Sequence, residues 1–335
     1  MSEVVTLGHG SGGKLAHELI DRVFVSNFGM TGPLTDSAIL EYSGVTLAFT
    51  TDSYVIDPLF FPGGDIGKLA VCGTVNDLAV SGADVKYMAT SFIIEEGFPL
   101  SDLRRIAASM TEEAKKAGIR IVTGDTKVVE KGKCDKLFIN TSGTGFLRPD
   151  LRHISTGSKI RPGDKLIING PLGNHSAAIL AARNIFNFSI PVESDCASLN
   201  HLINSVLKKS SEVHFMRDLT RGGLSSVLNE LSDMISYDII VNEASVPVEE
   251  PVKGLCEILG FDPLSLANEG KVLFVVGEND HEMIMDVLRS DPLGRNSAVI
   301  GGIINSEIKR VILNTSVGGR RILDMPSGIQ LPRIC

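Results

Sequence analysis

Apolar residues recur along the first half of the chain at spacings that alternate between those of strands and those of helices. Runs rich in β-branched and aromatic residues predict strands over 45–51, 85–94, 119–122 and 137–144. Residues 101–117 instead carry an apolar stripe at helical spacing. Ser101 stands at the predicted N-cap of this helix and Gly118 just past its end. A further helix is predicted to follow Lys68.

The second half repeats this alternation after a polar, glycine-containing stretch, 152–163, which we interpret as a linker. Strands are predicted at 165–168, 238–241, 272–276 and 298–304. Helices are predicted at 176–184, 199–207, 252–259 and 281–288, and a glycine pair at 222–223 opens another. The pattern predicts an α+β protein with one domain over 1–150 and a second over 151–323.

The last twelve residues, 324–335, form a predicted tail that ends in a cysteine. Proline, serine and glycine in this stretch indicate a loop. Fixing each residue of such a tail costs roughly 1–2 kcal/mol of backbone entropy. We therefore expect a mobile arm with a nucleophile, Cys335, at its tip. The alternative is an exposed cysteine on a frayed terminus.

Composition narrows the classes of partner. The formal net charge is −8 and tryptophan is absent, which argues against a nucleic-acid partner. No apolar run approaches the ~20 residues that span a bilayer, and no signal peptide is evident. The five cysteines are odd in number and widely spaced, which favours a reduced, cytoplasmic protein.

A glycine loop near the start, residues 8–15, satisfies the pattern G-x-x-x-x-G-K. Leu15 stands where a P-loop needs a hydroxyl for magnesium, so a true P-loop is not expected. We expect a loop in which the amides of Gly12 and Gly13, together with Lys14, fold over phosphates.

Acidic residues recur beside glycine, serine or threonine in turns and at predicted strand ends: Asp36, Asp52, Asp77, Asp125 and Asp218. Magnesium takes oxygen ligands, usually a few carboxylates together with nucleotide phosphates. These acids therefore favour a Mg-nucleotide site assembled from distant segments. Asp77 stands in an otherwise apolar helix, where a buried carboxylate needs a partner. A solvated helix face is the alternative for that residue.

Six segments resemble one known family. They are 9–13 (HGSGG), 51–64 (TDSYVIDPLFFPGG), 122–129 (VTGDTKVV), 218–223 (DLTRGG), 267–271 (ANEGK) and 332–335 (PRIC). On these residues the chain resembles the HypE family, the hydrogenase expression/formation proteins with carbamoyl dehydratase activity. That family lies within the aminoimidazole-ribonucleotide-synthetase-like (PurM-like) superfamily. The terminal Pro-Arg-Ile-Cys is the most specific piece.

The resemblance implies a fold and an activity. The fold is a two-domain PurM-like one, with N-terminal sheets that pair into a barrel-like homodimer, a C-terminal mixed α/β sandwich, and ATP at the domain and subunit junction. A carbamoyltransferase, HypF, places a carbamoyl group on Cys335. ATP-dependent dehydration converts that group to a thiocyanate, whose cyanide passes to iron on a HypC–HypD scaffold during [NiFe]-hydrogenase maturation.

The resemblance also implies residue roles. The five aspartates would hold one or two Mg²⁺ ions. Asn76 would contact nucleotide or metal, Lys14 or Lys68 would meet phosphates, and Gly12, Gly13 and Thr126 would lie at the cofactor. Removal of the two N–H protons needs a base, for which Glu269 and Lys127 are the alternatives. A structural ion pair between domains is the competing role for these two residues.

Two other functions stay open at this point. A superfamily relative such as thiamine-monophosphate kinase, selenophosphate synthetase or the purine synthetase acts on a free small molecule and needs no terminal cysteine. A nucleotide-binding adaptor in metallocentre assembly would bind Mg-ATP without turnover.

Overall fold

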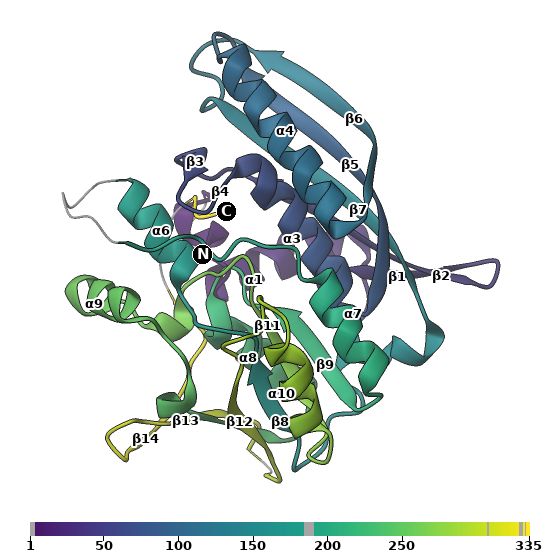
Figure 1. The fold of residues 1–335 in the computed structure, drawn as a ribbon, viewed down its shortest axis with the longest axis vertical. Helices are drawn as coiled ribbons and strands as arrows, with labels where there is room; N and C mark the ends of the chain where they lie inside the picture. Colours follow the sequence, from purple (N-terminus) through teal and green to yellow (C-terminus); the bar gives the residue numbers. More distant parts are fainter. Residues whose placement is uncertain (1–3, 184–190, 307, 328–330, 332) are drawn as a thin grey trace.

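Two mixed sheets, one from each half of the chain, lie on either side of a central helix, α3 (Ile66–Val80) (Figure 1). The computed structural model describes residues 4–183, 191–306, 308–327, 331 and 333–335. The predicted two-domain α+β architecture is confirmed. No helix in these described ranges is long and apolar enough to cross a membrane.

The N-terminal sheet has the strand order β1-β2-β7-β5-β6. Its strands are β1 (Ala38–Tyr42), β2 (Val45–Tyr54), β5 (Ala83–Glu95), β6 (Arg120–Val129) and β7 (Leu137–Leu147). All neighbours pair antiparallel except β5 and β6, which are parallel. A short hairpin, β3 (Phe60–Phe61) with β4 (Gly64–Asp65), leads into α3. The four predicted strands are confirmed, although all four extend beyond their predicted C-terminal ends.

Helix α3 is buried on nearly all sides. Asp65 caps its start, because its carboxylate accepts hydrogen bonds from the amides of Gly67 (2.8 Å) and Lys68 (3.0 Å). Lys68 and Asp77 are the only residues of the helix that are not fully buried. The helix packs on β2 and β7 on one side, and against the C-terminal domain on the other. It therefore belongs to the cores of both domains.

Helix α4 (Leu100–Ala117) covers the same sheet beside α3 and is amphipathic as predicted (Figure 1). Its N-cap is Pro99, so the expected cap at Ser101 is wrong. The carbonyl of Pro99 accepts the amides of Asp102 and Leu103, which starts the helix one residue before Ser101. Gly118 ends the helix in the left-handed conformation (φ 71°), which glycine adopts without steric penalty.

The C-terminal sheet has the order β14-β13-β10-β12-β8-β11-β9. Its strands are β8 (Lys165–Ile168), β9 (Val213–Asp218), β10 (Asp238–Asn242), β11 (Val272–Val276), β12 (Ala298–Ile304), β13 (Val311–Asn314) and β14 (Arg320–Ile322). The helices around it are α5 (His153–Thr156), α6 (Asn174–Ala182), α7 (Asn200–Lys209), α8 (Gly223–Met234), α9 (Glu250–Leu259) and α10 (His281–Arg289).

Most predicted elements of this half are confirmed, but three strands were not predicted. Strand β9 is buried at every residue although His214, Arg217 and Asp218 are polar, so its hydrophobic pattern is broken. Strands β13 and β14 lie at the far edge of the sheet and are only a few residues long. The predicted helix end at Asn184 lies outside the described residues, as does Pro332.

The stretch interpreted as a linker, 152–163, carries α5, which packs on β9 with Ile154 completely buried. One hydrophobic core runs through both halves, from Ala48 in β2 to Leu288 in α10. The connection is therefore a packed part of the protein, and the two domains share their core.

Two glycine substitutions test the packing around α3. A Cβ atom at Gly73 would lie 2.2 Å from the Tyr54 hydroxyl oxygen, so we expect Gly73→Ala to reduce the free energy of unfolding by roughly 1–3 kcal/mol through over-packing. Gly254 in α9 has no heavy atom within 4 Å of such a position, so Gly254→Ala is expected to stabilise the fold by about 0.5–1 kcal/mol. Urea unfolding measures both, and changes of the same sign would contradict the packing described.

Candidate functional site

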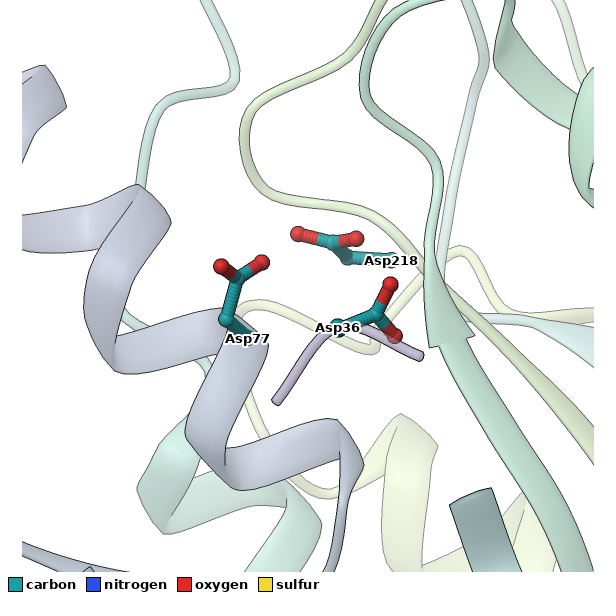
Figure 2. A group of neighbouring side chains, drawn as sticks. All are labelled: Asp36, Asp77 and Asp218. Atoms are coloured by element: carbon teal, nitrogen blue, oxygen red, sulfur yellow. The ribbon is translucent and has the colours of Figure 1, made fainter. Parts of the chain in front are cut away.

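Three carboxylates from distant segments meet at the junction of the two domains. Asp36 precedes β1, Asp77 lies in α3, and Asp218 ends β9. Each offers one oxygen, and these oxygens lie within 4.8 Å of one another. Figure 2 shows the three side chains turned toward a common space. The predicted grouping holds within one chain for these three of the five aspartates.

Neighbouring side chains hold this carboxylate cluster unequally. Arg217 Nε lies 3.2 Å from Asp36 Oδ2, and the Thr50 hydroxyl donates to Asp77 Oδ2 at 2.8 Å. Asp218 Oδ2 is buried without a hydrogen-bond partner among the described residues. A buried, unpartnered carboxylate oxygen is costly unless a cation or a proton compensates it.

The pKa values of the cluster reflect this environment. Burial raises the pKa of Asp77 and of Asp218 well above the ordinary value, and the charges of neighbouring carboxylates raise it further. Burial also raises the pKa of Asp36, although the Arg217 charge opposes the shift. A bound cation would offset both the energetic cost of burying these negative charges and the repulsion between them. Oxygen donors of this kind fit Mg²⁺.

Asp52 lies on β2, on the same face as Thr50 and Tyr54, and this face is turned toward α3. The Tyr54 hydroxyl donates to Asp52 Oδ2 at 2.8 Å. Burial raises the pKa of Asp52, and its charge in turn raises the pKa of Asp77 and Asp218. It therefore stands beside the carboxylate cluster, outside the group of three.

The end of the tail is inserted next to these acids. Ile334 is buried, and Cys335 lies close enough to Arg221, Glu269 and Asp52 that their charges act on its thiol. Burial raises the pKa of the Cys335 thiol to about 12, with Arg221 opposing the shift. In this docked position the thiol is protonated at neutral pH and is a poor nucleophile.

Glu269 faces the tail from the C-terminal domain. It is 3% exposed, and its Oε1 has no hydrogen-bond partner among the described residues. Burial raises its pKa well above the ordinary value, with the charges of Asp218 and Asp52 adding to the shift. A carboxyl group in such an environment is suited to proton transfer near neutral pH.

Asn76 and Asn268 hold the backbone around Glu269. The Asn76 amide donates to the carbonyls of Ala197 (3.0 Å) and Glu269 (3.4 Å), and it accepts from Leu199 N at 2.8 Å. Asn268 Oδ1 accepts from Gly173 N at 2.7 Å. Asn76 was expected to contact nucleotide or metal. In the structure its side chain instead forms hydrogen bonds with backbone groups, and it positions the backbone of Glu269.

The glycine loop packs between the start of α8 and the tail. A Cβ atom at Gly12 would lie 2.8 Å from Arg221 Cβ, and one at Gly13 would lie 2.2 Å from the Pro326 carbonyl oxygen. Lys14 N donates to that same carbonyl (3.2 Å) as α1 (Lys14–Leu19) begins. The close packing therefore requires glycine at both positions.

A cleft of ≈ 680 Å³ opens beside the glycine loop and the carboxylate cluster. Gly10, Gly12, Asp36, Arg217 and Arg221 are among its lining residues. Its size and its position next to acids and loop amides suit a nucleotide. Lys68 lies apart from it, at the start of α3, where its Nζ donates to the Gly63 carbonyl at 2.9 Å.

Three predicted site residues are not brought to this site within one chain. Asp125, Thr126 and Lys127 lie inside β6, an edge strand, and not in a loop after a strand as expected. Asp125 pairs with Ser91, and Lys127 with Ile93. Side chains alternate between the two faces of a sheet, so both point to the face turned away from α3.

Asp125 and Lys127 bind each other on that outer face. Lys127 Nζ lies 2.6 Å from Asp125 Oδ2, and this hydrogen bond lowers the pKa of Asp125. Lys127 therefore has no ion pair with Glu269 within the chain. The sheet itself separates the two candidate bases.

Sequence reasoning gave no role to Arg217, Arg221 or Tyr54. Arg221 lies inside the segment 218–223 and Arg217 directly precedes it, so this motif could have indicated that both arginines lie at the site. Tyr54 follows Asp52 at the two-residue spacing of one strand face. His175, whose Nε2 contacts the Ile334 carbonyl of the tail, and Ser194, which contacts His175 Nδ1, stand in no motif.

The chain is similar to proteins of known kind over nearly its full length. Residues 34–147 match the family described as AIR synthase related protein, N-terminal domain, and residues 161–314 match its C-terminal domain. A carbamoyl dehydratase HypE from Rhodobacter capsulatus is 49% identical over 99% of this chain and 98% of its own length.

Two solved structures are similar in fold and sequence. HypE in a HypE–HypF complex has a TM-score of 0.86 at 45% identity, covering 92% of this chain and 99% of that chain. A hydrogenase maturation protein HypE in complex with ATP has a TM-score of 0.82 at 44% identity, covering 99% of this chain and 100% of that one.

The carboxylate cluster predicts an unusual dependence of stability on pH and Mg²⁺. Asp77 and Asp218 have native pKa values above their unfolded values, so their contribution to stability is present at low pH and is lost as pH rises through the native values. We expect the melting temperature without Mg²⁺ to fall as pH rises above the ordinary carboxyl pKa, and added MgCl₂ to reverse this fall.

Asp77→Asn is expected to stabilise the metal-free protein at pH 8 by roughly 1–2 kcal/mol, because one buried like charge is removed, and to reduce the stabilisation by MgCl₂. Thermal melts measure both effects. Asp150→Asn, at an exposed aspartate that pairs with Arg148 outside the cluster, is the control and should leave the Mg²⁺ response unchanged. Equal Mg²⁺ responses in Asp77→Asn and the unmutated protein would contradict a cation site at this cluster.

Proposed function

The chain belongs to the HypE carbamoyl dehydratases of the AIR synthase related family, and from this premise we propose how its residues carry out the reaction. The substrate is a carbamoyl group on the sulfur of Cys335, and the product is a thiocyanate on the same sulfur. The observation that carries the proposal is the docking of the chain's own terminal thiol beside Arg221, Glu269 and Asp52.

Dehydration of an amide removes its oxygen and two protons. Hydroxide is a poor leaving group, so the carbamoyl oxygen first takes the γ-phosphoryl group of ATP and ADP leaves. The C–O bond then breaks, inorganic phosphate departs with that oxygen, and both N–H protons are lost, which leaves S–C≡N. Phosphoryl transfer asks the protein mainly for positioning and charge neutralisation.

Several groups support a nucleotide beside the docked tail. The cleft between the glycine loop and Arg221 lies next to the carboxylate cluster. Asp36, Asp77 and Asp218 would hold Mg²⁺, with Asp52 beside them. When bound, Mg²⁺ neutralises phosphate charge. Arg221 supplies a further positive charge close enough to interact with both the thiol and Asp52.

Glu269 is the base that this arrangement favours. It stands beside the thiol, and its raised pKa gives it high affinity for a proton once it is ionised. Its backbone is fixed by Asn76 and by the carboxylate of Asp195, which accepts from Glu269 N at 3.2 Å.

We infer that Asp125 and Lys127, on the outer face, serve the site of a second copy of the chain, with Thr126 between them on the same strand. The outer face of the N-terminal sheet exposes large apolar side chains, among them Phe49, Tyr87, Ile93 and Phe146. Such a patch indicates a protein partner, and a paired sheet in a homodimer would cover it. Lys127 on this face then acts across the subunit boundary.

The partners follow from the chemistry. A carbamoyltransferase, HypF, must load the thiol, and an iron scaffold such as HypC–HypD must accept the cyanide. Loading needs the tail outside its docked position, because the free thiol there is protonated. Cys335 must stay a free thiol between cycles, which suits the reducing cytoplasm.

Intact-protein mass spectrometry tests the reaction. We expect HypF to add one carbamoyl group to the protein, and this adduct to lose one water only when Mg-ATP is present. Glu269→Gln should keep the carbamoyl adduct but dehydrate it at least ~10²-fold more slowly, as expected for loss of a catalytic base. Glu278→Gln, at a surface glutamate of the same domain, is the matched control. A carbamoyl adduct that persists under Mg-ATP in the unmutated protein would contradict the proposal.

Mixed dimers test the role of Lys127. The Lys127→Ala and Glu269→Gln variants, co-expressed with different tags, give heterodimers in which one site combines an intact Glu269 with the partner's intact lysine. We expect thiocyanate to form on the Lys127→Ala chain alone, although each variant by itself is nearly inactive. Heterodimers as inactive as the two parents would show that both residues serve the same chain.

A further inference from the structure

The docked tail is held through its main chain and through the Arg333 side chain, which donates to the Val55 carbonyl at 2.8 Å and pairs with Asp135. Val55 N donates to a terminal oxygen of Cys335 at 3.1 Å, and the Arg183 guanidinium donates to the Arg333 carbonyl at 2.7 Å. His175 Nε2 lies 2.7 Å from the Ile334 carbonyl oxygen. The Ile334 side chain itself is buried among apolar residues.

Among these partners His175 is a completely buried side chain. It lies in the first turn of α6, and its ring meets the edge of Phe61 at 5.6 Å between centroids and an interplanar angle of 89°. Nδ1 lies 2.7 Å from the Ser194 hydroxyl. Both ring nitrogens are therefore engaged, one by the tail and one by the protein.

The hydrogen bonds fix where the ring proton lies. The Ile334 carbonyl oxygen can only accept, so Nε2 carries the hydrogen and Nδ1 accepts from the Ser194 hydroxyl. Ser194 Oγ accepts in turn from Cys196 N at 3.1 Å. Burial lowers the pKa of His175, which favours this neutral form. A continuous chain of donors thus runs from segment 194–196 to the tail.

The same segment supports Glu269. Asp195, between Ser194 and Cys196, forms a salt bridge with Lys271 (2.9 Å) and accepts the Glu269 amide at 3.2 Å. One short stretch of backbone therefore orients both the proposed base and the histidine that binds the tail. The position of the sulfur relative to Glu269 depends on this shared support.

We propose that His175 is a positioning residue that latches the tail in its docked state and so sets the fraction of chains whose sulfur lies beside Glu269. The catalytic part of this inference rests on the proposed function. The latch itself does not, because it is a contact between residues of the chain.

Alkylation of Cys335 measures the latch directly. The docked Cys335 is partly exposed, but burial of its thiol raises the pKa to about 12, so iodoacetamide reacts mainly with the undocked fraction. Loss of the His175 donor leaves a buried carbonyl unpaired, so we expect His175→Ala to raise the alkylation rate of Cys335 about tenfold to a hundredfold. Mass spectrometry of the C-terminal peptide gives the rate.

Internal and matched controls separate the latch from general unfolding. Cys72 and Cys256 are buried and should stay protected, while Cys134, which is partly exposed, should react at an unchanged rate.

The variant His175→Gln keeps an N–H donor and should restore most of the protection of Cys335. His201→Ala, at a histidine on α7 that contacts the Lys116 carbonyl, should have no effect. If His175→Ala exposes the buried thiols, Ser194→Ala takes its place and is expected to raise the Cys335 rate less.

A second measurement uses the reaction. After HypF has loaded the tail, His175→Ala should dehydrate the carbamoyl group more slowly in proportion to its docked fraction, which falls by a smaller factor than the undocked fraction rises, whereas loading itself should not slow. An unchanged Cys335 alkylation rate in a folded His175→Ala protein would overturn the latch. Failure of the unmutated protein to dehydrate its adduct would instead contradict the proposed function and leave the alkylation result to decide the latch.

Discussion

Helix α3 lies between the two sheets, and the rest of the site depends on its burial from both sides. A helix with no solvent face must satisfy each polar group it carries inside the protein. Asn76 meets this condition with backbone groups of the other domain, and Asp77 accepts a hydrogen bond from the Thr50 hydroxyl at the domain junction. The helix that joins the two cores therefore also fixes one carboxylate of the cluster and the backbone of Glu269.

The carboxylate cluster is an unfavourable arrangement in the absence of a cation. Burial and mutual repulsion raise the pKa values of its members; Arg217 forms a salt bridge with Asp36, and its charge only partly opposes the shift of Asp218. Proteins tolerate such local instability where function needs it, because the large shared core supplies stability elsewhere. The domain junction is thus prepared for positive charge before any nucleotide arrives.

The tail adds a second constraint, because here the substrate is part of the chain. Its hydrogen bonds involve main-chain oxygens of residues 333–335 and the Arg333 guanidinium, so the docked position does not depend on what the sulfur carries. Cys335 can therefore occupy the same docked position as a free thiol, with a carbamoyl group on its sulfur or as a thiocyanate. Because the docked thiol has a raised pKa, it is a poor nucleophile in this position. Loading therefore takes place with the tail undocked, and dehydration with the tail docked.

The sequence by itself determined the two α+β domains, most of the strands and helices, the acids and the terminal cysteine, because hydrophobic periodicity and motif residues are local properties. It could not give β9, whose polar residues are buried by long-range pairing, or the start of α4 at Pro99.

Only the tertiary structure decided that Asp36, Asp77 and Asp218 converge, and that Asp125 and Lys127 face the opposite side of the sheet. The reason is that a strand's two faces are fixed by the helix packed on one of them, and which acids share a face depends on that packing. The role of His175 was likewise invisible in the sequence, because its partners Ser194 and Ile334 are near it only in the folded chain.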